Sequence, residues 1–296
     1  MKYKTIEWSI VSSPECPGDN AIGVVTLNRP EHSNALGPRM GMELDQVMDE
    51  IRHSGVRVVI ITGKGSNFCA GGDLQVETIP MERPEDDWGL KGEYGEIVTW
   101  WMNDYFHLIS QRACIKLENL PQPVIAAVNG IAVGVGLELA ISCDLRIATT
   151  KVRFAELAVP AGFMSEWSAP RVLPQLIGQT RASEMILTGR MVYAEEALSW
   201  GLVNKIVEPE ALMDEAMKMA GAMASYPNVG LKYAKETLRL YQHLNRSEEN
   251  TRVELERVLE ITRNKDCAEG LNAFLSKRAP MYHPNNPVRR PGKEAK

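Results

Sequence analysis

The stretch VNGIAVGVGLELA, residues 128–140, decides how the rest of the sequence is interpreted. Its valines, isoleucine and leucines are typical of a buried core, yet three glycines, Gly130, Gly134 and Gly136, interrupt it. A single carboxylate, Glu138, follows two residues after the last glycine. A charge in such apolar surroundings costs free energy unless a partner or a function offsets it. The stretch therefore predicts a strand-to-helix corner that carries a functional glutamate.

The regions on either side alternate between strand and helix patterns. Apolar runs closed by turn residues predict strands over 21–30 (AIGVVTLNRP), 56–63 (VRVVIITG), 122–129 (QPVIAAVN) and 143–149 (CDLRIAT). Between the first two strands, GPRMGMELDQVMDEIRHSG (37–55) carries apolar residues at helical spacing. This alternation predicts an α/β core.

The pattern past Thr180 is helical almost throughout. Helices are predicted over RASEMILTG, AEEALSWG and PEALMDEAMKMAGAMASY, and over an amphipathic run at 246–263. Only one short strand, VNKIV (203–207), is predicted to interrupt them. The chain is thus expected to have an α/β core over 1–205 and a helical region over 206–296 that belongs to the same structural unit.

Residues 73–123 form a long predicted connection within the core. Its middle is acidic and punctuated by proline and glycine, and it then becomes aromatic at Trp100, Trp101, Tyr105 and Phe106. Long polar connections of this kind are often lids or substrate loops. The aromatic residues are expected to cover a ligand pocket or to contact another subunit.

Composition excludes several classes of protein. A formal net charge of -5 argues against a protein that binds nucleic acid. Five cysteines without CxxC spacing and five histidines without ligand spacing predict neither a disulfide framework nor a metal site. No apolar run approaches about 18 residues, and charges interrupt the N-terminal segment before any signal-type run develops. We therefore expect a cytoplasmic protein with no membrane partner.

Two glycine-rich corners follow predicted strands. One contains Ala70, Gly71 and Gly72, with Asp73 as a plausible helix N-cap, and the other contains Gly134, Val135 and Gly136. One such cluster alone is most simply a tight turn. Two clusters can direct two backbone N–H groups and two helix N-termini at one oxyanion. The phosphate-binding patterns Gly-x-Gly-x-x-Gly after a strand and Gly-x-x-x-x-Gly-Lys-Ser/Thr do not occur, so a nucleotide is a poor candidate ligand.

These motifs resemble the crotonase (enoyl-CoA hydratase/isomerase) superfamily. The resemblance runs through VVTLNRPEHSNALG, VVIITGKGSNFCAGGDL, PVIAAVNGIAVGVGLELAISCDLRIA, EMILTGRMVYAEEALSWGLVNKIV and AFLSKRAP. It implies a spiral of repeated ββα units, followed by a helical C-terminal trimerisation region that forms trimers or dimers of trimers. It also implies an acyl-CoA thioester as substrate, with no further cofactor.

The family pattern assigns roles to individual residues. It implies that the backbone N–H groups of Gly72 and Val135 form an oxyanion hole for the thioester enolate. Val135 stands where the family usually has glycine, which a backbone donor tolerates if its φ and ψ are allowed. Glu138 stands where many members carry one of two acid/base carboxylates. Its burial is expected to raise its pKa toward the range that suits proton transfer.

The second carboxylate departs from the pattern. Within FAELAVPAG (154–162), alignment on Phe154 and Gly162 puts Ala158 where family hydratases have a glutamate. Glu156 lies two residues earlier, roughly 6.6 Å away on the same face of an extended segment. It is expected either to serve a shifted substrate or to point into solvent. Glu166 is a third candidate.

Other positions match the family's coenzyme A contacts. The loop residues Asn34, Ala35 and Leu36 and the C-terminal residues Phe274 and Lys277 match directly, although each could equally serve packing or solvation. The first glycine corner is expected to approach the same ligand through Ala70, Gly71 and Asp73.

The best interpretation is an enoyl-CoA hydratase-like lyase that adds or removes water at C2/C3. Other reactions that need one carboxylate and the oxyanion hole are the alternatives: double-bond isomerisation, decarboxylation or hydrolysis of an acyl-CoA. A non-catalytic acyl-CoA-binding homologue is the alternative outside enzymes.

Overall fold

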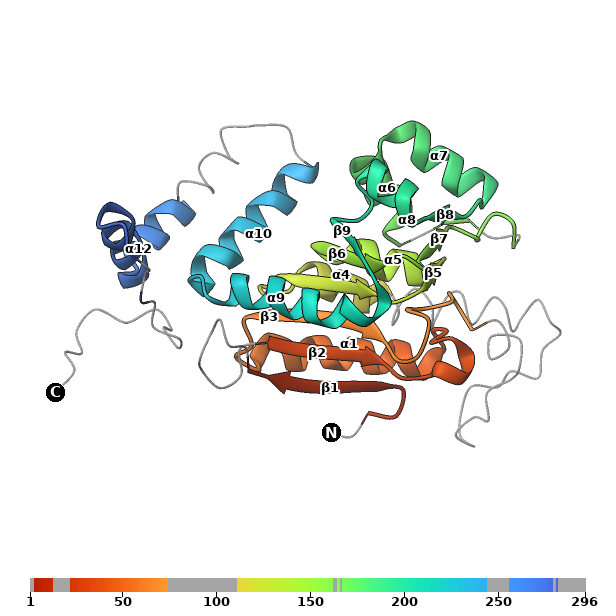
Figure 1. Ribbon diagram of the computed structural model, residues 1–296, viewed down its shortest axis with the longest axis horizontal. Helices are drawn as coiled ribbons and strands as arrows, with labels where there is room; N and C mark the ends of the chain where they lie inside the picture. Colours follow the sequence, from red (N-terminus) through yellow and green to blue (C-terminus); the bar gives the residue numbers. More distant parts are fainter. Residues whose placement is uncertain are drawn as a thin grey trace.

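A sheet of six strands forms the centre of the molecule (Figure 1). The computed structural model describes residues 3–12, 22–73, 111–161, 164–165, 167–243, 256–278 and 281. The strands of this sheet, in spatial order, are β1 (Ile6–Val11), β2 (Ile22–Leu27), β3 (Val58–Gly63), β4 (Val124–Val128), β6 (Leu145–Thr149) and β9 (Lys205–Val207). Only β1 runs antiparallel to its neighbour. The α/β class is therefore confirmed.

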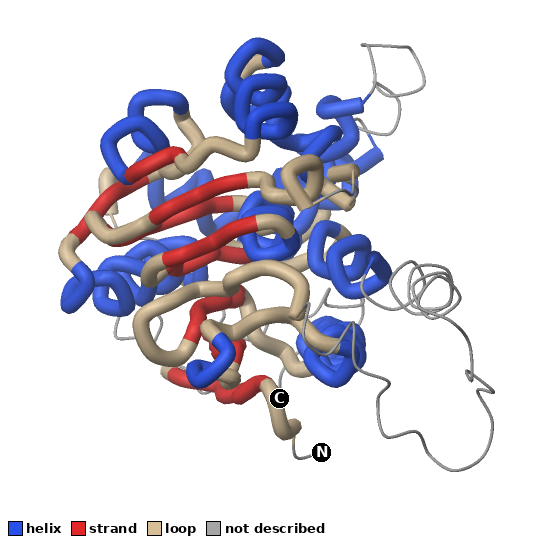
Figure 2. Tube along the Cα trace, turned by 90° about the vertical axis from the view of Figure 1, so that its right-hand side faces the viewer, coloured by secondary structure: helices blue, strands red, loops and turns tan. Residues whose placement is uncertain are grey.

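The sheet is apolar on both faces because helices cover both. In β3, Val59 and Ile61 point to the larger core, whereas Val58 and Ile60 point to the opposite face. This alternation is the ordinary geometry of a strand. Helix α9 (Leu212–Ala224) covers the second face with small residues, and the larger core lies against α1 (Pro38–His53). Figure 2 shows helices on both sides of the strands.

A second, smaller sheet makes the spiral of the fold. It joins β5 (Ile131–Val133), β7 (Arg153–Ala155) and β8 (Val192–Tyr193). A strand of the larger sheet, a strand of the smaller sheet and a helix follow one another twice along the chain. The first set is β4, β5 and α5 (Val135–Ser142), and the second is β6, β7 and α6 (Ala169–Ile177). Two successive ββα units result, which confirms the predicted architecture.

The remaining helices lie mostly in the second half of the chain. Their bounds are α4 (Gln111–Glu118), α7 (Gln179–Thr188), α8 (Ala194–Trp200), α10 (Asn228–His243) and α12 (Lys265–Leu275), with short 3-10 turns at Pro30–His32 and Pro209–Ala211. Residues 256–262 are also helical. In Figure 1, α10 and α12 lie at one end of the molecule and α6 to α8 at the other.

Three sequence-based expectations need correction. The strand over 122–129 does not run on to Gly134, because the chain turns at Asn129 and Gly130 before β5 begins. The Asn129 side chain donates to the carbonyls of Gly63 and Gly65, which fixes this turn. A second short strand, β8, interrupts the helices past Thr180. The connection over 73–123 ends in helix α4, and its residues 74–110, with the four aromatic residues, lie outside the described part.

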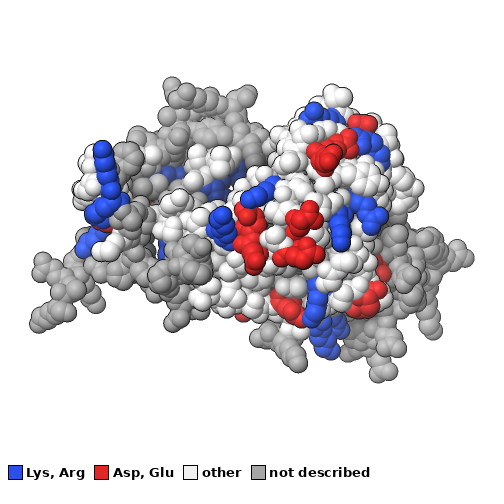
Figure 3. Space-filling model, viewed as in Figure 1, with Lys and Arg blue, Asp and Glu red and all other residues white. Residues whose placement is uncertain are grey.

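The predicted boundary at residue 205 coincides with the first residue of β9. Because β9 pairs with β6, and α9 covers the sheet, the beginning of the helical region belongs to the core. Among the described residues, no helix is long and apolar enough to cross a membrane. On the face drawn in Figure 3, the described basic and acidic side chains are interspersed rather than gathered by sign.

Candidate active site

The first glycine corner is held open by the loop that precedes α1. Leu36 donates its N–H to the carbonyl of Gly71 at 2.8 Å, and its own carbonyl accepts the N–H of Asp73 at 3.0 Å. This parallel pairing uses the groups on either side of Gly72 and leaves the Gly72 N–H on the opposite side of the chain. The Gly72 N–H donates to no described residue.

The second corner is the start of α5. Gly134 has φ +51°, which favours glycine, and its N–H donates to the carbonyl of Ala155 at 2.9 Å. Val135 is the first residue of α5, so its N–H has no acceptor within the helix and donates to no other described residue. The positive end of the helix dipole lies at the same point.

The two corners pack directly against each other. Val133 donates to the carbonyl of Cys69 at 3.1 Å, so the chain segments that precede the two corners are paired. A Cβ placed on Gly134 would lie 3.9 Å from the Cα of Gly71. A Cβ placed on Gly136 would lie 2.2 Å from the Cys69 carbonyl, so only glycine fits there. The sequence therefore brings together two corners whose Gly72 and Val135 N–H groups donate to no described residue.

Asn34 holds the loop beside the first corner. It has φ +56° and no exposed surface. Its amide group donates to the carbonyls of Lys64 and Asn67 and accepts the N–H of Arg29. A ligand contact at this position would therefore involve the loop rather than the Asn34 side chain.

The same loop is fixed by a buried ion pair. Arg29 contacts the Asp73 carboxylate at 2.7 Å and also donates to the carbonyl of Ala35 at 2.7 Å. Asp73 therefore joins the loop to the glycine corner. The predicted helix N-cap at Asp73 involves the residues that follow it, and these lie outside the described part.

Glu138 is buried near the beginning of α5, one turn after Val135. Its side chain is 3% exposed, and Oε1 accepts the N–H of Ala169, the first residue of α6, at 3.3 Å. The hydroxyl of Ser168 donates to the Glu138 carbonyl at 2.9 Å. The N-terminus of α6 thus faces the carboxylate, and both its N–H group and its dipole stabilise a negative charge there.

Glu156 is also buried, which excludes the expected alternative that it points into solvent. It follows β7 directly and is 2% exposed, and Oε1 accepts the N–H of Ala158 at 3.2 Å. Oε2 accepts no hydrogen bond from the described residues. Burial raises the pKa of Glu156, while the Ala158 N–H and the nearby Ser165 hydroxyl partly oppose this rise in pKa.

Residues of one short stretch of the chain contact both glutamates. Ser165, which is buried, lies beside Glu156, and Ser168 and Ala169 contact Glu138. Glu156 also follows Ala155, whose carbonyl accepts the Gly134 N–H of the second glycine corner. Glu166, the third candidate, lies outside the described residues.

Comparison with known proteins identifies the family of the chain. The model of the enoyl-CoA hydratase/isomerase family matches residues 18–285. The chain belongs to this family. It is an enzyme of the enoyl-CoA hydratase/isomerase type. Its similarity to hydratases among its relatives supports a hydratase-like function.

The relatives of this enoyl-CoA hydratase/isomerase family member include both isomerases and hydratases. It is 32% identical to 1,2-epoxyphenylacetyl-CoA isomerase of Escherichia coli, over 89% of this chain and 95% of that protein. It is 34% identical to (E)-benzylidenesuccinyl-CoA hydratase of Thauera aromatica, over 89% and 96%. The crystal structure of an enoyl-CoA hydratase from Bacillus anthracis superposes with a TM-score of 0.80 at 30% identity, covering 95% of this chain and 100% of that one.

Not every predicted ligand contact of the family lies near the corners. The backbone of Phe274 belongs to α12, and the exposed Lys277 follows this helix with φ +53°. Figure 1 shows α12 at the end of the molecule opposite α5 and β5. Within one chain, the fold therefore does not bring these two residues to the glycine corners.

An apolar cavity of about 10 Å³ lies beside Glu138, which is room for one water-sized group. It is lined by Leu36, Gly41, Leu44, Ala113, Cys114, Leu139 and Trp167. Three of these lining residues, Gly41, Cys114 and Trp167, were not among the predicted site residues. Gly41 did carry a signal, because a glycine inside a helix costs stability unless close packing requires it.

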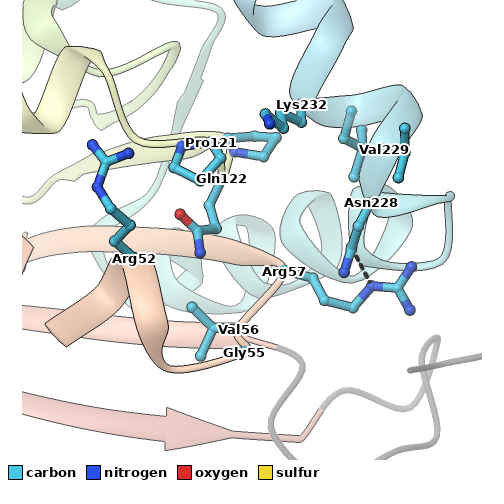
Figure 4. A pocket seen from close by; sticks show the side chains of 11 residues that line it. Arg52, Gly55, Val56, Arg57, Pro121, Gln122, Asn228, Val229 and Lys232 are labelled. Atoms are coloured by element: carbon cyan, nitrogen blue, oxygen red, sulfur yellow. Dashed lines mark hydrogen bonds between the residues drawn. The ribbon is translucent and has the colours of Figure 1, made fainter. Parts of the chain in front are cut away.

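A larger cavity, of about 210 Å³, lies elsewhere (Figure 4). Arg57 lies just before the first residue of β3, and Gln122 lies shortly before β4, so this cavity is at the opposite end of those strands from the glycine corners. Figure 4 shows the charged ends of Arg52 and Arg57 pointing away from each other. The side chains do not converge, and we do not assign this cavity to the reaction.

The burial of Glu156 predicts a pH-dependent stability. The pKa of Glu156 in the folded protein lies above the ordinary 4.5. As the pH rises past 4.5, the unfolded chain therefore releases the Glu156 proton while the folded protein still holds it. The wild type should therefore lose unfolding free energy relative to Glu156→Gln as the pH rises from about 4.5 to the folded-state pKa. Urea denaturation of both proteins across this range measures the difference. A difference that does not change with pH would contradict the burial.

Proposed function

We propose that the protein adds water across the C2=C3 double bond of a 2-enoyl-CoA thioester. The observation that supports this proposal is the packing of two corners whose Gly72 and Val135 N–H groups donate to no described residue, with the buried Glu138 and Glu156 on segments bonded to the second corner. During the addition, the oxygen of water bonds to C3 and the π electrons move toward the thioester oxygen. The two N–H groups would stabilise the resulting enolate oxyanion. A proton delivered to C2 then completes the hydration.

The environments of the two carboxylates suit different roles. The carboxylate of Glu138 accepts the Ala169 N–H at the start of α6, and we assign it as the base that takes a proton from water. Burial raises the pKa of Glu156, so we assign it as the acid that protonates C2. An acid/base pair of this kind needs one carboxyl group that is protonated and one that is ionised.

We infer that the acyl group of the substrate is apolar. Two relatives, 1,2-epoxyphenylacetyl-CoA isomerase and (E)-benzylidenesuccinyl-CoA hydratase, are named for aromatic acyl groups. We infer a coenzyme A thioester as the substrate, and no separate cofactor takes part in the proposed reaction.

Double-bond isomerisation is the second candidate function, and Ala158 is the observation that favours it. In the family pattern, hydratases carry a glutamate at this position. Here the position is Ala158, and its N–H donates to the carboxylate of Glu156. If that hydrogen bond keeps Glu156 away from the substrate, Glu138 alone would move a proton between carbon atoms of the enolate.

A panel of enoyl-CoA thioesters distinguishes these functions. Hydration raises the product mass by one water, and isomerisation leaves the mass unchanged. Binding without turnover across the panel would instead support the non-catalytic homologue. We expect products heavier by one water.

The double-mutant cycle of the two glutamates tests their joint action. Glu156→Gln should lower kcat by about 10²-fold, since it removes the titrating group and keeps the side-chain size. Because residues that act as a unit are not additive, Glu138→Gln/Glu156→Gln should lose much less than the product of the two single losses. Steady-state kinetics of the four proteins gives the answer. Full activity in Glu156→Gln would leave Glu138 as the only assigned carboxylate and favour isomerisation.

We also propose that the protein is a homo-oligomer, a trimer or a dimer of trimers. Large apolar side chains are exposed on the C-terminal helices, including Leu238, Leu271 and Leu275. Such surfaces are usually covered in an assembly. Light scattering at micromolar concentration should give the mass of three or six chains, and the mass of one chain would contradict the proposal.

The buried thiols of Cys69, Cys114 and Cys143 are unpaired, which supports the proposed cytoplasmic location.

A further inference from the structure

The C-terminal end of α5 is bound by two arginines. The side chain of Arg239 donates through Nη2 to the carbonyl of Ser142, the last residue of α5, at 2.9 Å. Arg146 donates to the next carbonyl, that of Cys143, at 2.8 Å. The last carbonyls of a helix lack partners within it, and cations are favourable at that end of the helix dipole. The end opposite Val135 is therefore fixed from outside the helix.

Arg239 reaches α5 from a distant part of the chain. It belongs to α10, the helix that follows α9, and it also donates to Oδ1 of Asp144 at 2.9 Å. Its neighbour one turn earlier, Lys235, contacts Oδ2 of the same aspartate at 2.7 Å and donates to the carbonyl of Gln122 at 2.8 Å. Lys235 is 6% exposed, so this contact is made inside the protein. Helix α10 is thus attached to the chain directly after α5.

Glu118 connects the same cluster to the helices on either side of α5. Its carboxylate accepts two hydrogen bonds from Nη2 of Arg171 in α6, at 2.5 and 2.7 Å, and one from the Ser142 hydroxyl at 3.3 Å. Nη1 of Arg239 lies 3.7 Å from Glu118 Oε2. We call Glu118, Asp144, Arg171, Lys235 and Arg239 the α5 clamp. Charged hydrogen bonds with several partners hold geometry more firmly than isolated surface pairs.

The clamp lies close to the site along the helix. Ser142 follows Glu138 by four residues, about 6 Å, and follows Val135 by seven residues, about 10.5 Å. A helix of only eight residues is not stable by itself, so its position depends on what holds its two ends. A displacement at Ser142 is therefore transmitted to both Glu138 and the Val135 N–H.

We propose that Arg239 is a positioning residue: it fixes the C-terminal end of α5 and thereby keeps the Val135 N–H and the Glu138 carboxylate in their reactive places. It touches neither group. Its effect on turnover rests on the proposed function, whereas its effect on α5 does not. The inference also makes α10, at the start of the helical C-terminal part, a determinant of the site geometry.

Arg257 provides a matched control. It lines the same cavity of about 590 Å³ as Arg239 and contacts α10 through Thr237, at 3.0 Å, and Glu236, at 3.2 Å. None of these contacts involves α5. Arg257→Met therefore removes one arginine from the same region without touching the clamp.

Kinetics of three variants gives the first readout. Arg239→Met should lower kcat about 10-fold with KM changed less than about twofold, because a small misplacement of reacting groups slows chemistry more than binding. Arg239→Lys keeps the charge but loses the planar guanidinium, whose Nη2 bonds Ser142 and Asp144 while Nη1 faces Glu118, so it should recover only part of the loss. Arg257→Met should stay within about twofold of the wild type. Equal kcat in Arg239→Met and the wild type, or an equal loss in Arg257→Met, would overturn the proposal.

Hydrogen exchange gives a readout that does not depend on the reaction. The amides of residues 138–142 should exchange faster in Arg239→Met than in the wild type, and Arg257→Met should leave them unchanged. If Arg239→Met does not fold, the same comparison is made with Arg239→Lys. Unchanged exchange in a folded Arg239 variant would overturn the proposal. A wild type that turns over no enoyl-CoA would defeat the proposed function, and the exchange data would still decide the role of Arg239.

Discussion

Glu138→Gln is expected to lower kcat by about 10²- to 10⁴-fold while the affinity for acyl-CoA stays close to that of the wild type. The amide oxygen of glutamine can still accept the N–H of Ala169, so the hydrogen bond between α5 and α6 is kept. What the variant loses is the group that takes up and releases a proton. Stopped-flow or steady-state turnover of an enoyl-CoA, together with calorimetric binding of a saturated acyl-CoA, separates the two effects.

Stability measurements provide the control for this variant. Because Glu138 is buried, a general loss of structure would also lower activity. The Tm of Glu138→Gln should be equal to or above that of the wild type, since a neutral amide is less costly to bury than a carboxylate. A folded Glu138→Gln protein with normal turnover would remove Glu138 from the mechanism.

The second large effect is expected from the backbone at Val135. Val135→Pro removes the N–H that we assign to the oxyanion hole, and it should lower kcat by about 10²-fold or more. Proline is well tolerated at the first position of a helix, which is where Val135 lies. The Val135 N–H donates to no described residue, so the substitution breaks no hydrogen bond that supports the fold. Turnover and thermal unfolding are measured on the same preparation.

Val135→Gly is the matched variant because it keeps the donor and removes the side chain. It should retain activity, although the pocket becomes wider where the valine side chain was. Normal turnover by a folded Val135→Pro protein would show that the hole lies elsewhere, and inactivity of both variants would point to the valine side chain instead.

The longer elements could be predicted from the sequence because they are locally marked. Strand β3 lies within a run of β-branched residues that ends at Gly63, and α1 lies between Gly37 and Gly55 with a clear apolar face. Strands β5, β7 and β8 have two or three residues each, too few for any periodicity to be visible. They form because the fold brings their backbones together.

The site was predictable where it depends on the backbone alone. Glycines at 71, 72, 134 and 136 indicated two corners, and the structure packs these corners against each other. The burial of Glu156 was not predictable, because it depends on contacts with residues farther along the chain, such as Ser165. Arg239 lies 97 residues beyond Ser142, and no local pattern links a surface-like arginine in α10 to the end of α5.

The contact of Gly136 with the Cys69 carbonyl has a consequence for how active molecules arise. The two halves of the proposed hole come from segments more than sixty residues apart, and neither can adopt its final shape without the other. Closing so long a loop is a late and costly event in folding. The hole is therefore absent from any partly folded chain, however much helix that chain contains. A destabilising substitution in β3 or β4 should thus reduce the number of competent molecules in a population while each competent molecule works at the full rate.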